Sequence, residues 1–81
     1  MQLGEFLKGL NLLQTYYSDP EGYHLGADHD VIYAYPTDKP LPIAQLSRMK
    51  ELGWFQPEVE AGDGEWTPEL YDPEEGWAAF V

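Results

Sequence analysis

Residues 23–35 read YHLGADHDVIYAY, and the expected fold follows from this stretch. Its second half, from Asp30 to Tyr35, is rich in β-branched and aromatic residues, which favour a β-strand. Its first half, from Tyr23 to Ala27, predicts a second short strand, and Asp28-His29 between the two predicts a turn. Because both faces of the Asp30–Tyr35 strand carry apolar side chains, we expect this strand to lie in the centre of a sheet.

Helical spacing of apolar residues is found on both sides of these strands. On the N-terminal side it predicts an amphipathic helix over about residues 2–16, with a buried stripe of Leu3, Phe6, Leu7, Leu10, Leu13 and Tyr17. Gly4 and Gly9 lie within this helix, and each is expected to weaken it by about 1 kcal/mol. On the C-terminal side a second helix is predicted over about residues 42–52, with a buried stripe of Ile43, Leu46, Met49 and Leu52.

The remaining third of the chain predicts further strands. Gly62-Asp63-Gly64 is typical of a hairpin turn that would pair residues 54–60 with residues 65–70, and residues 77–81 predict a terminal strand. We therefore expect a single α+β domain over residues 1–81. Its two helices would pack on one face of a mostly antiparallel sheet of about four to five short strands.

Charge and composition exclude several classes of protein. The 81 residues include 15 acidic and 4 basic side chains, for a net charge of −11, and no basic residue follows Lys50. A direct binder of nucleic acid needs Lys and Arg to neutralise phosphates, so this class is excluded. No stretch approaches the roughly 20 apolar residues of a membrane span, and residues 1–13 do not resemble a secretory signal. With no cysteine, the chain fits a reducing cytoplasm.

The sequence lacks the parts of common catalytic sites. It has two serines, Ser18 and Ser47, no cysteine and no glycine-rich phosphate loop, so nucleophilic catalysis has no recognisable machinery. A glycosidase-type carboxylate pair would need a larger cleft than so short a chain can build. We therefore expect a protein that is not an enzyme and that carries no cofactor.

One local cluster has the composition of a metal site: His24, Asp28, His29 and Asp30. Two imidazoles and two carboxylates within seven residues could hold Zn²⁺ or another divalent ion. On a strand, however, His29 would point away from the other three, so a turn must bring it round. The alternative is a polar turn in which Asp28 or Asp30 caps neighbouring N–H groups. A small metal-binding protein is thus one functional hypothesis.

Residues 58–75, named here the acidic segment, carry the strongest signal for binding. Carboxylates can mimic phosphates, they steer a basic partner toward the protein, and aromatic side chains among them supply the anchors typical of binding hot spots. The predicted partner-binding residues are Glu58, Glu60, Asp63, Glu65, Trp66, Glu69, Tyr71, Asp72, Glu74 and Glu75. The alternative is a solvated loop whose Trp66 only covers the sheet.

Three short motifs, DHDVIY at 28–33, ELGWF at 51–55 and GWAAFV at 76–81, resemble those of short acidic proteins encoded by tailed phages and prophages. Residues 58–75 depart from that pattern, because they are longer than a tight hairpin needs. The resemblance implies a phage accessory protein that acts in the cytoplasm of a bacterial host. Small acidic phage proteins of this size include inhibitors of host defence, among them anti-CRISPR proteins.

Three functional hypotheses follow from these observations. The first is a non-enzymatic inhibitor that binds a basic surface on a host protein, such as a nucleic-acid-binding defence complex. The second is the metal-binding protein described above. The third is a self-associating adaptor that forms a homodimer through the edge of the terminal strand, Trp77–Val81.

Overall fold

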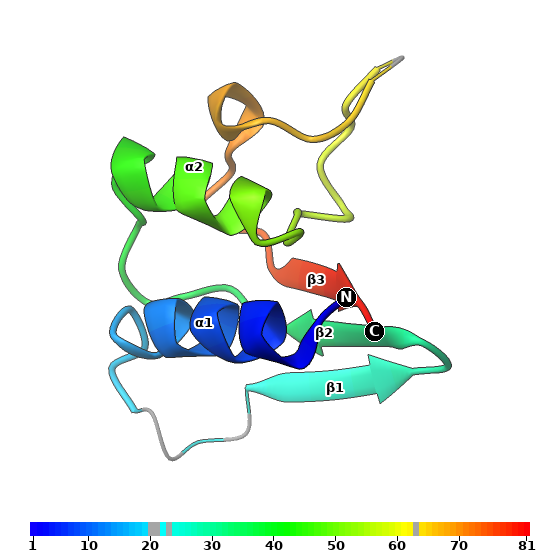
Figure 1. The fold of residues 1–81 in the computed structure, drawn as a ribbon. Coiled ribbons are helices and arrows are strands. Elements are labelled where there is room, and N and C mark those ends of the chain that lie inside the picture. The colour runs from blue at the N-terminus through cyan, green and yellow to red at the C-terminus, as the bar shows by residue number, and fades with distance from the viewer. Residues whose placement is uncertain (20–21, 23, 63) are drawn as a thin grey trace.

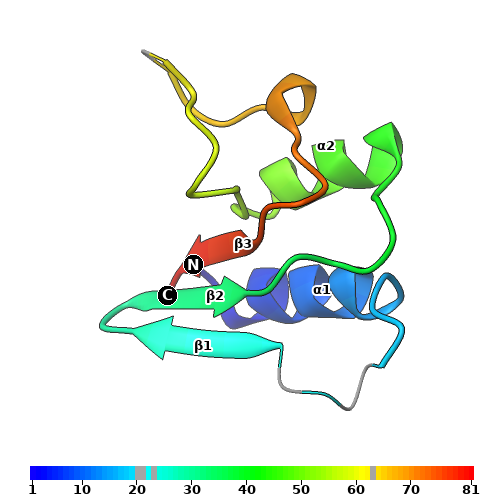
Figure 2. The same ribbon diagram turned by 180° about the vertical axis from the view of Figure 1, so that it is seen from behind.

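The computed structural model describes residues 1–19, 22, 24–62 and 64–81. The elements in chain order are α1 (Leu3–Gln14), β1 (Leu25–Asp28), β2 (Val31–Ala34), α2 (Ile43–Glu51), the 3₁₀ helix η1 (Pro68–Leu70) and β3 (Trp77–Phe80). α1 lies across one face of the sheet, and α2 lies beyond β3 (Figures 1 and 2). The acidic segment extends past α2, at the end of the molecule opposite β1 (Figure 1). The α+β class expected from the sequence is confirmed.

The sheet is antiparallel, with the strand order β1-β2-β3. β2 is therefore the central strand, as its two apolar faces predict. It pairs Ile32 with Ala27 on one side and with Ala79 on the other. The turn between β1 and β2 lies at His29-Asp30, one residue later than expected, and His29 adopts a positive φ of 53°. Tyr23, where the first strand was predicted to begin, lies outside the described residues.

The described residues form three strands instead of the expected four to five, because the hairpin predicted for residues 54–60 and 65–70 is not made. Only Phe55 joins the sheet, through an isolated bridge to Ala78. Pro57 has no N–H to continue this pairing, and Pro68 begins η1 where the second arm was expected. Since Ala78 exchanges two backbone hydrogen bonds with Phe55, the edge of the terminal strand that was expected to mediate a homodimer is partly occupied.

Both helices contribute to one core beneath the sheet. In α2, Leu46, Met49 and the adjacent Leu52 are buried as predicted, whereas Ile43 is exposed. Gly53 follows α2 with a φ of 89°, as expected for the glycine that ends a helix. All three tryptophans belong to this core, with at most 5% of any of them exposed.

α1 packs most of its predicted apolar face against the core, because Phe6, Leu10 and Tyr17 contact it as expected. Leu13 is buried, but Leu3 and Leu7 are 72% and 48% exposed. The buried face also includes Gly9, which lies against the indole of Trp54: a Cβ atom built on Gly9 would lie only 2.0 Å from Trp54 Nε1. The indole therefore fills the place that a side chain at position 9 would take, and this contact sets the rotation of α1.

No helix in the described part of the chain is long and apolar enough to cross a membrane.

Candidate functional site

A buried glutamine fixes the path of the acidic segment. Gln56 is 1% exposed, and its side chain makes four hydrogen bonds. Its Nε2 donates to the backbone oxygens of Asp72 (2.7 Å) and Glu75 (3.2 Å), and its Oε1 accepts from Trp66 Nε1 (3.1 Å) and from the Asp72 backbone N–H (3.0 Å). Buried polar groups that are all paired rigidify their surroundings. Gln56 thus ties the middle and the C-terminal end of the acidic segment to the core.

The two aromatic residues of the acidic segment pack against the core, Trp66 buried and Tyr71 half-buried. Trp66 is 5% exposed and meets the ring of Trp77 edge-on at 5.2 Å. The ring of Tyr71 stacks on Trp77 at 6.0 Å, and its hydroxyl accepts a hydrogen bond from the Leu41 N–H. These side chains hold the acidic segment against the sheet, as the alternative interpretation expects of Trp66. Their role as anchors for a partner stays a prediction.

A lysine of α2 adds a third attachment. Lys50 Nζ donates to the Trp66 backbone oxygen at 2.9 Å and lies 3.5 Å from Glu65 Oε2. Since Lys50 is one of only four basic residues in the chain, the acidic segment gains its only described cationic contact from this helix. Such an exposed pair contributes little to stability, so its effect is mainly to position the backbone near Trp66.

The carboxylates of the acidic segment face solvent. Glu58, Glu60, Glu65, Glu69 and Glu74 are exposed, and Asp72 and Glu75 are half-buried. Asp72 Oδ1 accepts the Glu74 backbone N–H at 2.9 Å and so stabilises the turn before β3. Asp63, the remaining predicted site residue, lies outside the described residues. The structure therefore presents a row of carboxylates on a backbone that is held from beneath.

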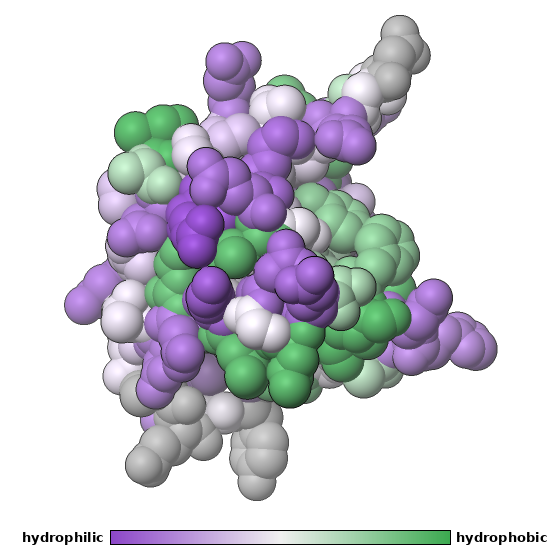
Figure 3. Space-filling model, viewed as in Figure 1, coloured by the Kyte–Doolittle hydropathy of each residue, from purple (hydrophilic) through white to green (hydrophobic). Residues whose placement is uncertain are grey.

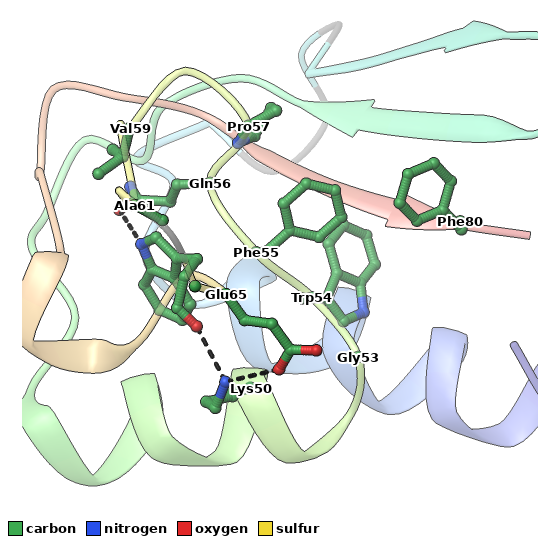
Figure 4. Close-up of a pocket in the computed structure, with 12 residues that line it drawn as sticks. Lys50, Gly53, Trp54, Phe55, Gln56, Pro57, Val59, Ala61, Glu65 and Phe80 are labelled. Atoms are coloured by element: carbon green, nitrogen blue, oxygen red, sulfur yellow. Dashed lines mark hydrogen bonds and ion pairs between the residues drawn. The ribbon is translucent and has the colours of Figure 1, made fainter.

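A groove of about 480 Å³ runs beside these carboxylates. Its walls include the stacked rings of Phe55 and Phe80, with centroids 5.4 Å apart, and its rim includes Glu65 (Figure 4). Phe80 is 58% exposed. The groove thus combines an apolar floor with a rim on which the Glu65 carboxylate is already paired with Lys50, and this lining suits an apolar or aromatic side chain.

The four residues of the predicted metal cluster do not come together. His24 lies before β1, where its ring stacks on Tyr17 at 4.2 Å and its Nε2 contacts the Asp19 backbone oxygen. At the other end of β1, His29 Nε2 lies 3.7 Å from Asp28 Oδ1, and both side chains are exposed. Among the described residues, no group of three or more possible ligands lies close enough to hold a metal ion. The length of β1 separates the two histidines.

Tyr17 provides a pH-dependent contribution to stability. Burial raises the pKa of its phenol to about 12, and the Asp38 carboxylate adds to this effect. Its hydroxyl donates to the Tyr35 backbone oxygen at 2.5 Å. Because the folded state favours the protonated phenol, the stabilisation is complete below pH of about 10, the ordinary tyrosine pKa. It is lost as the pH rises from about 10 to about 12.

In a Tyr17→Phe variant, the free energy of unfolding should therefore fall less steeply with pH in this alkaline range. Urea unfolding between pH of about 9 and 12 measures the slope, with Tyr33→Phe on the exposed side of β2 as the control. A Tyr17→Phe variant whose stability falls as steeply as that of the unmodified protein would contradict the assignment.

Comparison of the chain with protein-family models, with curated proteins and with solved structures finds no match.

Proposed function

We propose that this protein is a non-enzymatic binding protein whose acidic segment binds a basic surface on a protein of a bacterial host. The observation that carries the proposal is the set of exposed carboxylates Glu58, Glu60, Glu69 and Glu74. Glu69 and Glu74 lie in the part of the segment that the Gln56 side chain holds through Trp66, Asp72 and Glu75. A preordered surface loses less entropy on binding than a mobile loop does. The exposed carboxylates therefore bind a partner through their fixed positions as well as through their charge.

The electrostatics of the chain support a basic partner. A net charge of −11 in 81 residues produces a field that accelerates the approach of a cationic surface and repels anionic ones. The groove beside Phe55 and Phe80 would receive an apolar or aromatic side chain of that partner, while the exposed carboxylates outside the groove contact its cations. This combination of carboxylates and an apolar groove gives both speed and specificity of association.

The class of partner that fits this surface best is a protein that itself binds nucleic acid, because spaced carboxylates compete with phosphates for the same cations. We propose further that this encounter takes place in the cytoplasm of a bacterial host, as the resemblance of the three short motifs to those of phage and prophage proteins implies. Inhibition of a nucleic-acid-binding defence complex is then the proposed biological role.

A pair of charge reversals tests the acidic segment directly. Glu58→Lys combined with Glu69→Lys should abolish capture of the partner from bacterial lysate, or weaken its binding at least tenfold. Neither carboxylate has a partner among the described hydrogen bonds and ion pairs, so stability should change by less than about 0.5 kcal/mol. The captured protein is identified by mass spectrometry at low and at physiological salt, with and without added DNA.

The matched control is Asp30→Lys combined with Glu51→Lys, which changes the net charge equally at exposed positions outside the acidic segment. This control also removes the exposed Arg48–Glu51 ion pair, which contributes little to stability. Capture should survive in this control. Equal loss in both variants would mean that only net charge matters, and capture that persists in the Glu58 and Glu69 variant would rule out the acidic segment as the binding surface.

A further inference from the structure

The outer edge of β1 is open for pairing. β1 is the outermost strand of the described sheet, and the Tyr35 N–H donates to the His24 backbone oxygen. Hydrogen-bonded pairs alternate along an antiparallel ladder, so His24, Gly26 and Asp28 direct their backbone groups toward β2. Leu25 and Ala27 therefore direct their N–H and C=O groups outward, where they can pair with another strand.

The centre of this edge carries little of the usual protection against strand addition. Edge strands are commonly protected by proline, by charged side chains or by a covering helix. Residues 25–27 contain neither proline nor charge, and the one charged residue of β1, Asp28, lies at the end of the strand. α1 leaves β1 uncovered (Figures 1 and 2). Leu25 and Ala27 are both exposed on the helix side of the sheet. The edge is thus apolar as well as open.

α1 extends the same apolar surface. Leu3 and Leu7, which the sequence pattern assigned to the core, are exposed on this helix, and apolar side chains gather between α1 and β1 in Figure 3. A groove of about 210 Å³ between the two elements is lined by Leu10 and Leu25 among others. Leu3 and Leu7 of α1 and Leu25 and Ala27 of β1, named here the apolar strip, are therefore exposed apolar side chains on two neighbouring elements, and a single chain leaves them uncovered.

We propose that a second copy of this chain covers the apolar strip, with the two β1 strands paired antiparallel about a two-fold axis at Gly26. The joined sheet has six strands. Across the axis, Leu25 of each copy exchanges two backbone hydrogen bonds with Ala27 of the other, and the two Gly26 residues form the non-hydrogen-bonded pair between them. The exposed leucines of the two α1 helices then meet above the joined strands.

Charge favours a second copy over a basic partner at this surface. The apolar strip contains no carboxylate, so it offers nothing to a cationic surface. The acidic segments lie at the end of each molecule opposite β1 (Figure 1), and pairing through β1 keeps them far apart. In the register centred on Gly26, Asp28 of one strand lies opposite His24 of the other, so that the two aspartates do not face each other.

The mass of the protein in solution is the first test. Light scattering coupled to size exclusion should give twice the mass of one chain, and Leu25→Lys should give the mass of one chain, because it places a charge on the strand edge. Ile43→Lys, a change from an exposed apolar residue on α2, should remain dimeric. A single-chain mass for the unmodified protein at all concentrations, or a Leu25→Lys dimer, would overturn the proposal.

A cross-link tests the register. A Cβ atom at Gly26 would meet nothing within 4 Å, and the chain contains no other cysteine. Opposed residues of a non-hydrogen-bonded pair have Cα atoms about 4.5 Å apart, within the range that a disulfide spans. Gly26→Cys should therefore form a covalent dimer rapidly on mild oxidation, whereas the exposed control Ser47→Cys should not. Equal rates for the two variants would overturn the two-fold pairing at Gly26.

Discussion

Replacement of Gly9 by alanine is expected to destabilise the fold by about 3 kcal/mol or more, although alanine is the better helix former. The new Cβ would lie 2.0 Å from Nε1, 2.6 Å from Cδ1 and 2.7 Å from Cε2 of Trp54. Trp54 is 1% exposed, and its ring stacks on Phe6 at 5.7 Å. Neither the indole nor α1 can move without disturbing the core, so the clash outweighs a propensity gain of about 1 kcal/mol.

Gly4 supplies the matched control, because it lies in the same helix and a Cβ there would meet nothing within 4 Å. Gly4→Ala should leave stability unchanged or raise it by up to about 1 kcal/mol. Urea unfolding followed by tryptophan fluorescence gives both free energies of unfolding. If Gly9→Ala were as stable as Gly4→Ala, the close contact between α1 and Trp54 would be wrong.

The difference between these two glycines shows which features of the fold the sequence predicts and which it does not. Apolar spacing located both helices, and the composition of β2 placed this strand in the centre of the sheet. The same spacing could not reveal that Gly9 faces the core, because a contact with Trp54 depends on a residue 45 positions away. Spacing alone therefore assigned Leu3 and Leu7 to the core, whereas the packing of Trp54 leaves them on the surface.

The candidate site was predictable to a similar extent. The position of the carboxylates follows from composition, since a run rich in acids is expected to face solvent. The packing of Trp66 and Tyr71 against the core does not follow from composition, because an aromatic residue among acids is equally consistent with a binding anchor. Nothing in the sequence marks Gln56 as a residue of the site. A glutamine between Phe55 and Pro57 is unremarkable until four hydrogen-bonding groups, three of them backbone groups, are found around it.

Replacement of Gln56 by alanine should cost about 4 kcal/mol, because it leaves Trp66 Nε1 and three backbone groups unpaired and opens a cavity. Gln56→Met, which retains most of the volume, should still cost about 3 kcal/mol through the unpaired groups. The exposed Gln14 provides a control, and its replacement by alanine should have little effect. Urea unfolding of the three variants separates the hydrogen bonds from the cavity.

The same variant connects the stability of the fold with the proposed function, because it alters no carboxylate. Without Gln56, the backbone at Asp72 and Glu75 loses its attachment. In the variant, the amides of residues 64–75 should therefore exchange much faster than in the unmodified protein, while the amides of β2 remain protected. If binding depends on a fixed display, Gln56→Met should weaken capture of the basic partner under conditions in which α1 and the sheet remain folded. Undiminished capture, despite rapid exchange across residues 64–75, would mean that charge alone binds the partner and that the buried glutamine serves stability only.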